Sequence, residues 1–411
     1  MSRYLSNGSR FAFRSSSSSV AYCAVHIKTG TRNEPSRLAG LAHFTEHLLF
    51  KGTTSKSSCV INSKIEKLGG ELNAYTTKEE TVIHATVLKE DFQTAASLLV
   101  ELAFQCVFPA KEVEKERGVV VEEIKSYKDS PSELIYDEFD EKIFEGTPLS
   151  IPVLGTSASL KRITREDVVE YYNKMFVPEN MVFTVVAGLP CEKVVSVLEK
   201  QIEKYGRRGA DAIAEVQTPI APQPLEVAAP FEKKVSKKSH QAHCIIGARA
   251  YSFYEPKRIP LILLVNYLGG PAANSRLNMS LREKHALVYN VDASYAQYCD
   301  AGVVTIYFGC DKSNVARCEE LILRQINELI TNPLSPQKLK EAKKQLLGQL
   351  AISSDNGEAQ VLSMGKSEMV FGRVIEMEQT RQLLEQVTSE ELSQVAKEIF
   401  GEGKISKLYY L

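Results

Sequence analysis

The chain has 411 residues, and its 50 Lys and Arg residues nearly balance its 51 Asp and Glu residues, giving a net charge of -1. This length exceeds what one hydrophobic core usually organises, so we expect two or more domains. The balanced charge argues against nucleic acid as a main partner. No apolar run is long enough to cross a bilayer, so no membrane partner is expected either.

The N-terminal segment carries two opposing signals. The arginines and the serine run within residues 3–19 have no acidic neighbours, which is typical of transit peptides. However, Arg10–Arg14 and Val20–Ile27 look like two strands around a serine turn, which favours a folded segment. The eight cysteines lack a C-x-x-C pair and are expected to be free thiols of a reducing compartment. We therefore predict a cytoplasmic protein.

A helix over Leu41–Phe50 follows these strands and carries His43, Glu46 and His47. Positions four apart share one face of a helix, so both imidazoles can bind one metal ion. Glu46 lies at the rim of that face, where it can contact water on the metal. This H-x-x-E-H pattern is the reverse of the H-E-x-x-H pattern of zinc peptidases. The alternative is a hydrogen-bonded core cluster without a metal.

Helices and strands alternate through the rest of the first half, and some strands pair as hairpins. This order predicts an α+β fold with a mixed, largely antiparallel sheet and helices packed on it. The expected elements are a helix over Cys59–Leu68, strands over Glu71–Tyr75 and Glu80–Leu88, helices over Glu90–Cys106, Lys111–Tyr127, Ser132–Phe144 and Arg165–Met175, a strand over Asn180–Ala187, and a helix over Glu192–Tyr205.

A tetrahedral catalytic zinc site needs a third protein ligand. The predicted helix over Lys111–Tyr127 offers Glu116 and Glu123, which share a face because they are two turns apart. We predict Glu123 as the third ligand and Glu116 as the residue that orients a histidine. Glu122 competes for the ligand role, and the spacing leaves that choice open. These glutamates could instead form a solvated face, although Val119–Val121 beside them indicate partial burial.

Residues 209–234 are rich in Pro and Ala and are predicted to link a first domain over residues 1–208 to a second over residues 235–411. The second domain repeats the first. A predicted strand over Ile246–Pro256, the segment Ser335–Gln349 and the segment Val387–Leu392 echo first-half segments. On this alignment Leu264, Tyr267 and Leu268 take the places of His43, Glu46 and His47, and Ala342 and Gln349 those of Glu116 and Glu123. Because only one copy has ligand-type residues, we predict that they serve chemistry.

Four motifs in order resemble the pitrilysin family of inverzincin metallopeptidases, in size the branch that includes the mitochondrial processing peptidase. They are His43–His47, Gly70–Thr76, Glu116–Glu123, and Ser280–Arg282 with Leu287–Tyr289. The two repeated halves, joined by a linker, suggest two homologous layered domains that form a clamshell. The resemblance implies that Glu123 is the third zinc ligand and that Glu116 orients a histidine.

The resemblance adds roles that the residues alone do not indicate. It implies that Asn73, Ala74, Tyr75 and Thr76 form an exposed edge strand onto which a substrate peptide adds as a further strand. It also implies that Arg282 and Tyr289 reach the site from the opposite domain and contact the substrate carbonyl or the developing oxyanion. From the residues alone, we would expect an ordinary edge strand, a surface salt bridge and a core tyrosine.

The sequence therefore predicts a zinc-dependent endopeptidase that hydrolyses short or unfolded peptides in a chamber between two homologous domains. One zinc ion per chain, held by His43, His47 and Glu123, would activate water, with Glu46 as the general base. A homodimer is expected. The alternatives are a subunit of a presequence-processing peptidase and a non-catalytic scaffold relative, and the intact motif argues against the scaffold.

Overall fold

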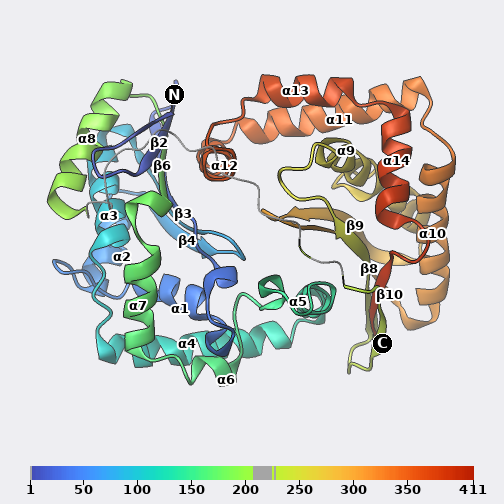
Figure 1. The fold of residues 1–411 in the computed structure, drawn as a ribbon, viewed down its shortest axis with the longest axis horizontal. Coiled ribbons are helices and arrows are strands. Elements are labelled where there is room, and N and C mark those ends of the chain that lie inside the picture. Colours follow the sequence, from blue (N-terminus) through green and yellow to red (C-terminus); the bar gives the residue numbers. More distant parts are fainter. Residues whose placement is uncertain (1, 207–224, 226–227) are drawn as a thin grey trace. The chain divides into compact units, whose positions relative to one another are not determined.

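The computed structural model describes residues 2–206, 225 and 228–411, which form two compact units, each built on a sheet (Figure 1). The first unit comprises the described parts of Met1–Lys125, Ile151–Pro219 and Ile352–Ile375. The second comprises the described parts of Ser126–Ser150, Ile220–Ala351 and Glu376–Leu411. The predicted α+β class with two layered domains is confirmed. The predicted clamshell concerns the arrangement of the units and stays a prediction.

In the described part of the chain, the first unit has a six-stranded sheet in the order β1-β2-β6-β3-β5-β4. Strands β2 and β6 are parallel and all other neighbours are antiparallel. The strands are β1 (Ser2–Tyr4), β2 (Arg10–Ser15), β3 (Val20–Ile27), β4 (Glu71–Thr76), β5 (Thr81–Leu88) and β6 (Met181–Ala187).

Helices cover both faces of this sheet, because its strands are apolar on both sides. Successive side chains of a strand point to opposite faces. Val25 of β3 accordingly joins the main core of the unit, whereas its neighbour Ala24 joins a smaller cluster with Val361 and Met364 of α12 (Gly357–Phe371). Helices α3 and α8 lie on one side of the sheet and α12 on the other (Figure 1). The further helices of the unit are α1 (Leu41–Leu49), α2 (Ser58–Glu66), α3 (Phe92–Phe104), α4 (Ala110–Lys128), α6 (Ser157–Leu160), α7 (Arg165–Met175) and α8 (Cys191–Tyr205).

The second unit repeats this plan. Its described strands follow the order β7-β11-β8-β10-β9, again with one parallel pair, β7 with β11. Helices α10 and α14 lie on one side of the sheet and α5 on the other (Figure 1). The elements are β7 (Glu232–Val235), β8 (Gln241–Ala250), β9 (Val288–Gln297), β10 (Gly302–Asp311), β11 (Ser406–Tyr410), α5 (Pro131–Ile143), α9 (Arg258–Gly269), α10 (Val315–Thr331), α11 (Pro336–Ser354), α13 (Met377–Gln386) and α14 (Ser389–Phe400).

Corresponding residues of the two halves form the same local structure, as the predicted internal repeat requires. Helices α7 and α14 both begin with a capping box, formed by Thr164 with Asp167 and by Thr388 with Glu391. The predicted strand over Ile246–Pro256 is misplaced, because β8 spans Gln241–Ala250. The strand ends at Ala250 because this residue pairs with Gly302, where its neighbour β10 begins.

The compact units differ from the predicted domains over residues 1–208 and 235–411 by an exchange of helices. Helix α5 belongs to the first half of the sequence but packs on β8 and β11 of the second unit. Helix α12 belongs to the second half but packs on β2, β3 and β6 of the first unit. The predicted linker over residues 209–234 lies largely outside the described residues, and its last residues enter β7. No helix in the described ranges is long and apolar enough to span a membrane.

Candidate active site and metal centre

Helix α1 begins at a glycine that is held in place by a buried carboxylate. Gly40 has a φ of +91°, and a side chain there would meet the carbonyl oxygen of Leu154 at 2.7 Å. The carboxylate of Glu34 accepts hydrogen bonds from the backbone N–H of Gly40 at 2.8 Å and of Ala42 at 2.9 Å. Glu34 thus satisfies N–H groups that the helix start leaves unpaired. This fixes where the next turn of α1 points.

That next turn brings both predicted histidines to one carboxylate of α4. His43 Nε2 lies 3.9 Å from one oxygen of Glu123, and His47 Nε2 lies 3.4 Å from the other. The two rings are edge to face, with centroids 4.6 Å apart. One ligand atom from each of the three residues lies within 4.8 Å of the others. These three side chains therefore form one compact donor set from two helices.

The structure also separates the two glutamates that the spacing left open. Glu122 is exposed, and its carboxylate pairs with Lys125 one turn further along α4, at 2.7 Å. Glu123 is also exposed, but its two carboxylate oxygens face His43 and His47. The rotation of α4 thus favours Glu123 as the metal-ligating residue.

Two imidazole nitrogens and a carboxylate suit zinc, which takes three protein ligands in its catalytic sites. Burial lowers the pKa of His43 to about 3, with a smaller contribution from His47, so His43 is neutral at physiological pH. A neutral imidazole is the form that binds a metal ion. His47 Nδ1 contacts the buried Glu116 at 3.0 Å, which leaves Nε2 of His47 facing Glu123. The residues present therefore fit a zinc ion.

Glu46 lies beside this donor set and is buried. Its Oε2 accepts a hydrogen bond from Thr76 of β4 at 3.0 Å. Burial raises the pKa of Glu46, and the charge of Glu123 adds to the rise, whereas His47 and the Thr76 hydrogen bond oppose it. A carboxylate with a raised pKa is a stronger base, as general base catalysis requires.

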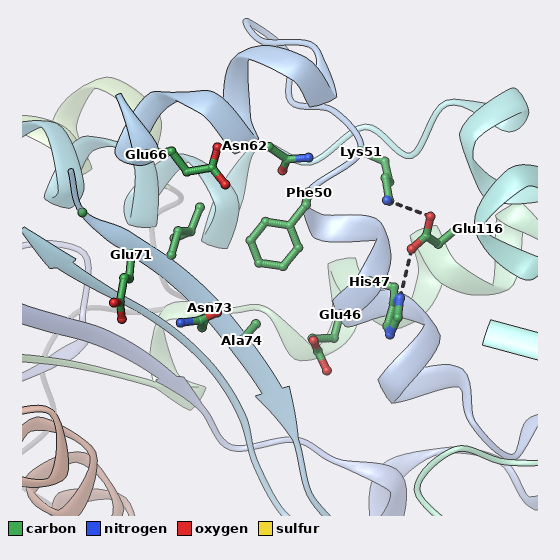
Figure 2. A pocket seen from close by; sticks show the side chains of 12 residues that line it. Glu46, His47, Phe50, Lys51, Asn62, Glu66, Glu71, Asn73, Ala74 and Glu116 are labelled. Carbon is green, nitrogen blue, oxygen red and sulfur yellow. Dashed lines mark hydrogen bonds and ion pairs between the residues drawn. The ribbon is translucent and has the colours of Figure 1, made fainter. Parts of the chain in front are cut away.

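The strand predicted to bind the substrate lies at an edge of its sheet, and its role in binding stays a prediction. In the described residues β4 is an end strand of its sheet and pairs with β5 alone. Asn73 and Ala74 line a cavity of about 630 Å³ that also reaches Glu46 and His47 (Figure 2). Tyr75 points to the other face of the sheet, where it packs against the cluster that includes α12.

The cavity is also lined by residues that the sequence analysis did not predict for the site, among them Phe50, Lys51, Asn62 and Glu66. Lys51 carried a usable signal, because it lies four residues after His47 and hence about one turn along the same face. Asn62 and Glu66 are also four apart, on α2, but nothing in the sequence places α2 beside α1.

Arg282 and Tyr289 both belong to the second unit. Arg282 lies in a short helical segment, Asn278–Glu283, and is exposed. Tyr289 of β9 is 57% exposed, and its hydroxyl donates to Asp311 at 2.9 Å. Tyr289 is therefore not the core tyrosine expected from the residues alone, while the roles implied for both residues stay predictions.

Comparisons with protein families divide the chain into two parts. Residues 10–157 match the Insulinase (peptidase family M16) domain, and residues 162–346 match the peptidase M16 inactive domain. The candidate metal ligands His43, His47 and Glu123 fall in the first match. Leu264, Tyr267 and Leu268, which replace the H-x-x-E-H residues in the repeat, fall in the second.

Similar proteins cover nearly the whole chain. An uncharacterized zinc protease of Bacillus subtilis is 30% identical over 380 residues, which is 92% of this chain and 90% of the relative. One from Streptomyces coelicolor is 30% identical over 372 residues, covering 90% and 81%. The crystal structure of a protease from Helicobacter pylori matches with a TM-score of 0.90 at 20% identity, covering 100% of this chain and 98% of that one. That structure supports the fold.

Proposed function

Because this chain belongs to peptidase family M16, the pitrilysin family, we propose that it is a zinc-dependent endopeptidase that cleaves short or unfolded peptides. The observation that carries the proposal is the donor set of His43, His47 and Glu123, whose ligand atoms lie within 4.8 Å of one another beside buried Glu46. The relatives named as zinc proteases support the same chemistry.

In this proposal His43, His47 and Glu123 hold one zinc ion per chain. When bound, zinc supplies a Lewis acid and an activated water for attack on a peptide carbonyl. Glu46 takes the proton of that water and later passes it to the leaving amine. Thr76 donates a hydrogen bond to Oε2 of Glu46, which helps to hold this carboxylate in place.

The peptide would bind along β4 as an additional antiparallel or parallel strand. Such pairing uses backbone hydrogen bonds, so it demands an extended chain but little sequence. This favours short or unfolded peptides over folded proteins. We further propose that Arg282 and Tyr289 contact the substrate carbonyl and the developing oxyanion. The predicted chamber depends on the arrangement of the units and stays a prediction.

The chain carries the metal donors together with the Arg282 and Tyr289 pair. We therefore propose that it acts without a different subunit, as a homodimer or a self-sufficient protomer. Light scattering of the purified protein would measure its mass, and an activity that appears only after a second kind of chain is added would overturn this proposal.

A chelator-sensitive assay on a mixture of unstructured peptides tests the function directly. Glu46→Gln should keep stoichiometric zinc and lose nearly all turnover, because only the proton acceptor is removed. His47→Ala should lose the metal itself. Wild-type turnover in Glu46→Gln would show that Glu46 is not the general base. Stoichiometric zinc in His47→Ala would show that the proposed ligand set is wrong.

A further inference from the structure

We infer that Lys51 is a positioning residue for the metal site, acting on His47 through Glu116. Its ammonium group lies 2.7 Å from Oε2 of Glu116, and the other oxygen of Glu116 lies 3.0 Å from Nδ1 of His47 (Figure 2). The carboxylate thus joins the lysine to the histidine. The inference rests on the proposed zinc site and adds a residue to its support.

The position of Lys51 follows from the end of α1. The helix ends at Leu49, and the backbone N–H of Lys51 still donates to the carbonyl oxygen of Leu48 at 3.1 Å. Lys51 therefore stays on the His47 side of the helix. From there its side chain, 21% exposed, extends to Glu116 of α4. The lysine closes a three-residue link between the two helices that supply the metal donors.

Burial gives this link its energetic importance. Glu116 is only 4% exposed, and a buried carboxylate is costly unless a cation and hydrogen bonds compensate it. Among the described residues, the carboxylate of Glu116 contacts the ring of His47 and the ammonium group of Lys51. A histidine that binds a metal ion is neutral, so it contributes a hydrogen bond but no positive charge. Lys51 is then the cation that balances Glu116.

With Lys51 in place, both oxygens of Glu116 are engaged and the carboxylate has a fixed rotation. The N–H of His47 Nδ1 can donate to one oxygen, which orients the ring so that Nε2 faces Glu123. Without the lysine, Glu116 is free to turn toward water in the adjoining cavity. The histidine would then lose the contact that sets its orientation.

Lys51 also lines the cavity, so a role in binding substrate is the competing explanation. The two roles predict different measurements. A lysine that contacts peptide would change KM and leave zinc affinity unaltered. A lysine that supports His47 would change zinc affinity in the absence of any peptide.

The chain provides a matched control in Lys56, whose ammonium group pairs with the buried Glu101 of α3 in the same unit. Like Lys51, Lys56 is a mostly buried lysine that compensates a buried glutamate. Neither Lys56 nor Glu101 has an ion pair or a hydrogen bond with His43, His47 or Glu123 among the described contacts. Lys56→Met therefore reports the structural cost of removing such a pair.

The experiment is a zinc competition titration against a chromogenic chelator on the full chain, with peptide absent. We expect Lys51→Met to weaken zinc binding about tenfold, within the range for residues that support metal ligands. Lys51→Arg should retain affinity close to wild type. Lys56→Met should lower the melting temperature without changing the zinc dissociation constant.

A double-mutant comparison tests whether Lys51 acts through Glu116. Glu116→Gln should weaken zinc binding by itself, and adding Lys51→Met to it should cause no further loss. A wild-type zinc affinity in Lys51→Met, an equal loss in Lys56→Met, or a full additional loss in the double variant would each overturn the inference. If His47→Ala binds zinc as tightly as wild type, the proposed function itself fails.

Discussion

The burial of Glu34 and its hydrogen bonds have opposite effects on the pKa of its carboxyl group. Its carboxylate accepts N–H groups at the start of α1, which favours the charged form, yet burial is the larger effect and raises its pKa to about 8. The helix that carries His43 and His47 therefore begins at a carboxyl group that holds its proton in the folded protein around neutral pH.

This raised pKa predicts that stability falls as pH rises. The ordinary pKa of the group is 4.5, so between pH 4.5 and 8 the folded protein binds this proton more tightly than the unfolded chain. The contribution is fully present below the lower value and is lost as pH rises through the higher one. Urea unfolding across this interval should show wild type losing free energy of unfolding relative to Glu34→Gln. Parallel pH profiles for the two proteins would contradict the assignment.

Thr76 allows a second prediction at this scale, because its hydroxyl donates to the proposed base Glu46. Thr76→Val removes the contact that orients this carboxylate, so kcat should fall, by at most about tenfold to a hundredfold, since a hydrogen bond to a charged group is worth about 1.5–3 kcal/mol. Thr76→Ser keeps the hydroxyl and should retain most of the turnover. Steady-state kinetics would measure both variants, and equal kcat values for Thr76→Val and wild type would show that the hydroxyl does not serve the base.

The sequence predicted the residues whose geometry is local. His43, Glu46 and His47 lie within two turns of one helix, so helical spacing alone brings them to one side. The choice of Glu123 as the third ligand required the structure, because Glu122 fits the same spacing. Only the rotation of α4 relative to α1 shows which of the two carboxylates faces the histidines. The role of Lys51 could not be derived, since its partner Glu116 lies 65 positions away along the chain on a different helix.

At the scale of elements, two glycines of α12 allow this helix to pack closely on the first sheet. A side chain at Gly365 would lie 2.0 Å from Nε2 of His26, and one at Gly357 would lie 2.2 Å from the ring of Tyr22. Further contacts of α12 with this sheet are an ion pair of Lys366 with Glu80 at 3.0 Å and a contact of the Glu358 carboxylate with Nδ1 of His84 at 3.1 Å. These contacts explain why α12 packs here, far from its sequence neighbours.

Gly365→Ala should therefore destabilise the protein despite the higher helix propensity of alanine. Overpacking of this kind typically costs about 1–3 kcal/mol. Gly348 of α11 is the matched control, because it is also helical but has open space around it, so Gly348→Ala should be stabilising by about 1 kcal/mol. Thermal unfolding of both variants measures the difference, and a stable Gly365→Ala protein would mean that α12 does not pack closely on His26.

The type of most elements was predictable, whereas the packing of α5 and α12 was not. Apolar periodicity is a local property and identifies a helix or a strand without naming its partner. Both helices have an apolar side that would suit either sheet. The contacts that decide between the two sheets connect positions far apart in the chain: Gly365 and His26 are 339 residues apart, and Phe139 and Gly247 are 108 apart.

At the scale of the whole molecule, one face of each sheet is covered by a helix from the other half of the sequence. Helix α12 covers Ala12, Ala24, Val82 and Val186 of the first sheet. Helix α5 covers Ile245, Leu408 and Tyr410 of the second. The repeated halves are thus related in fold, but neither half contains all the elements of its own unit.

This exchange predicts that the sequence half with the metal donors does not fold alone. A fragment of residues 1–208 lacks α12 and would leave an apolar sheet face in water, where burial is worth about 25 cal/mol per Å². We expect weakly cooperative urea unfolding for this fragment. A peptide of residues 352–375 supplied in trans should restore cooperative unfolding and zinc binding, because it completes the first unit. A peptide of residues 377–386, which carries α13, should not, since α13 belongs to the second unit and packs on α9. A fragment that is fully cooperative alone, or that responds equally to both peptides, would show that the exchanged helix is dispensable to the metal-bearing unit.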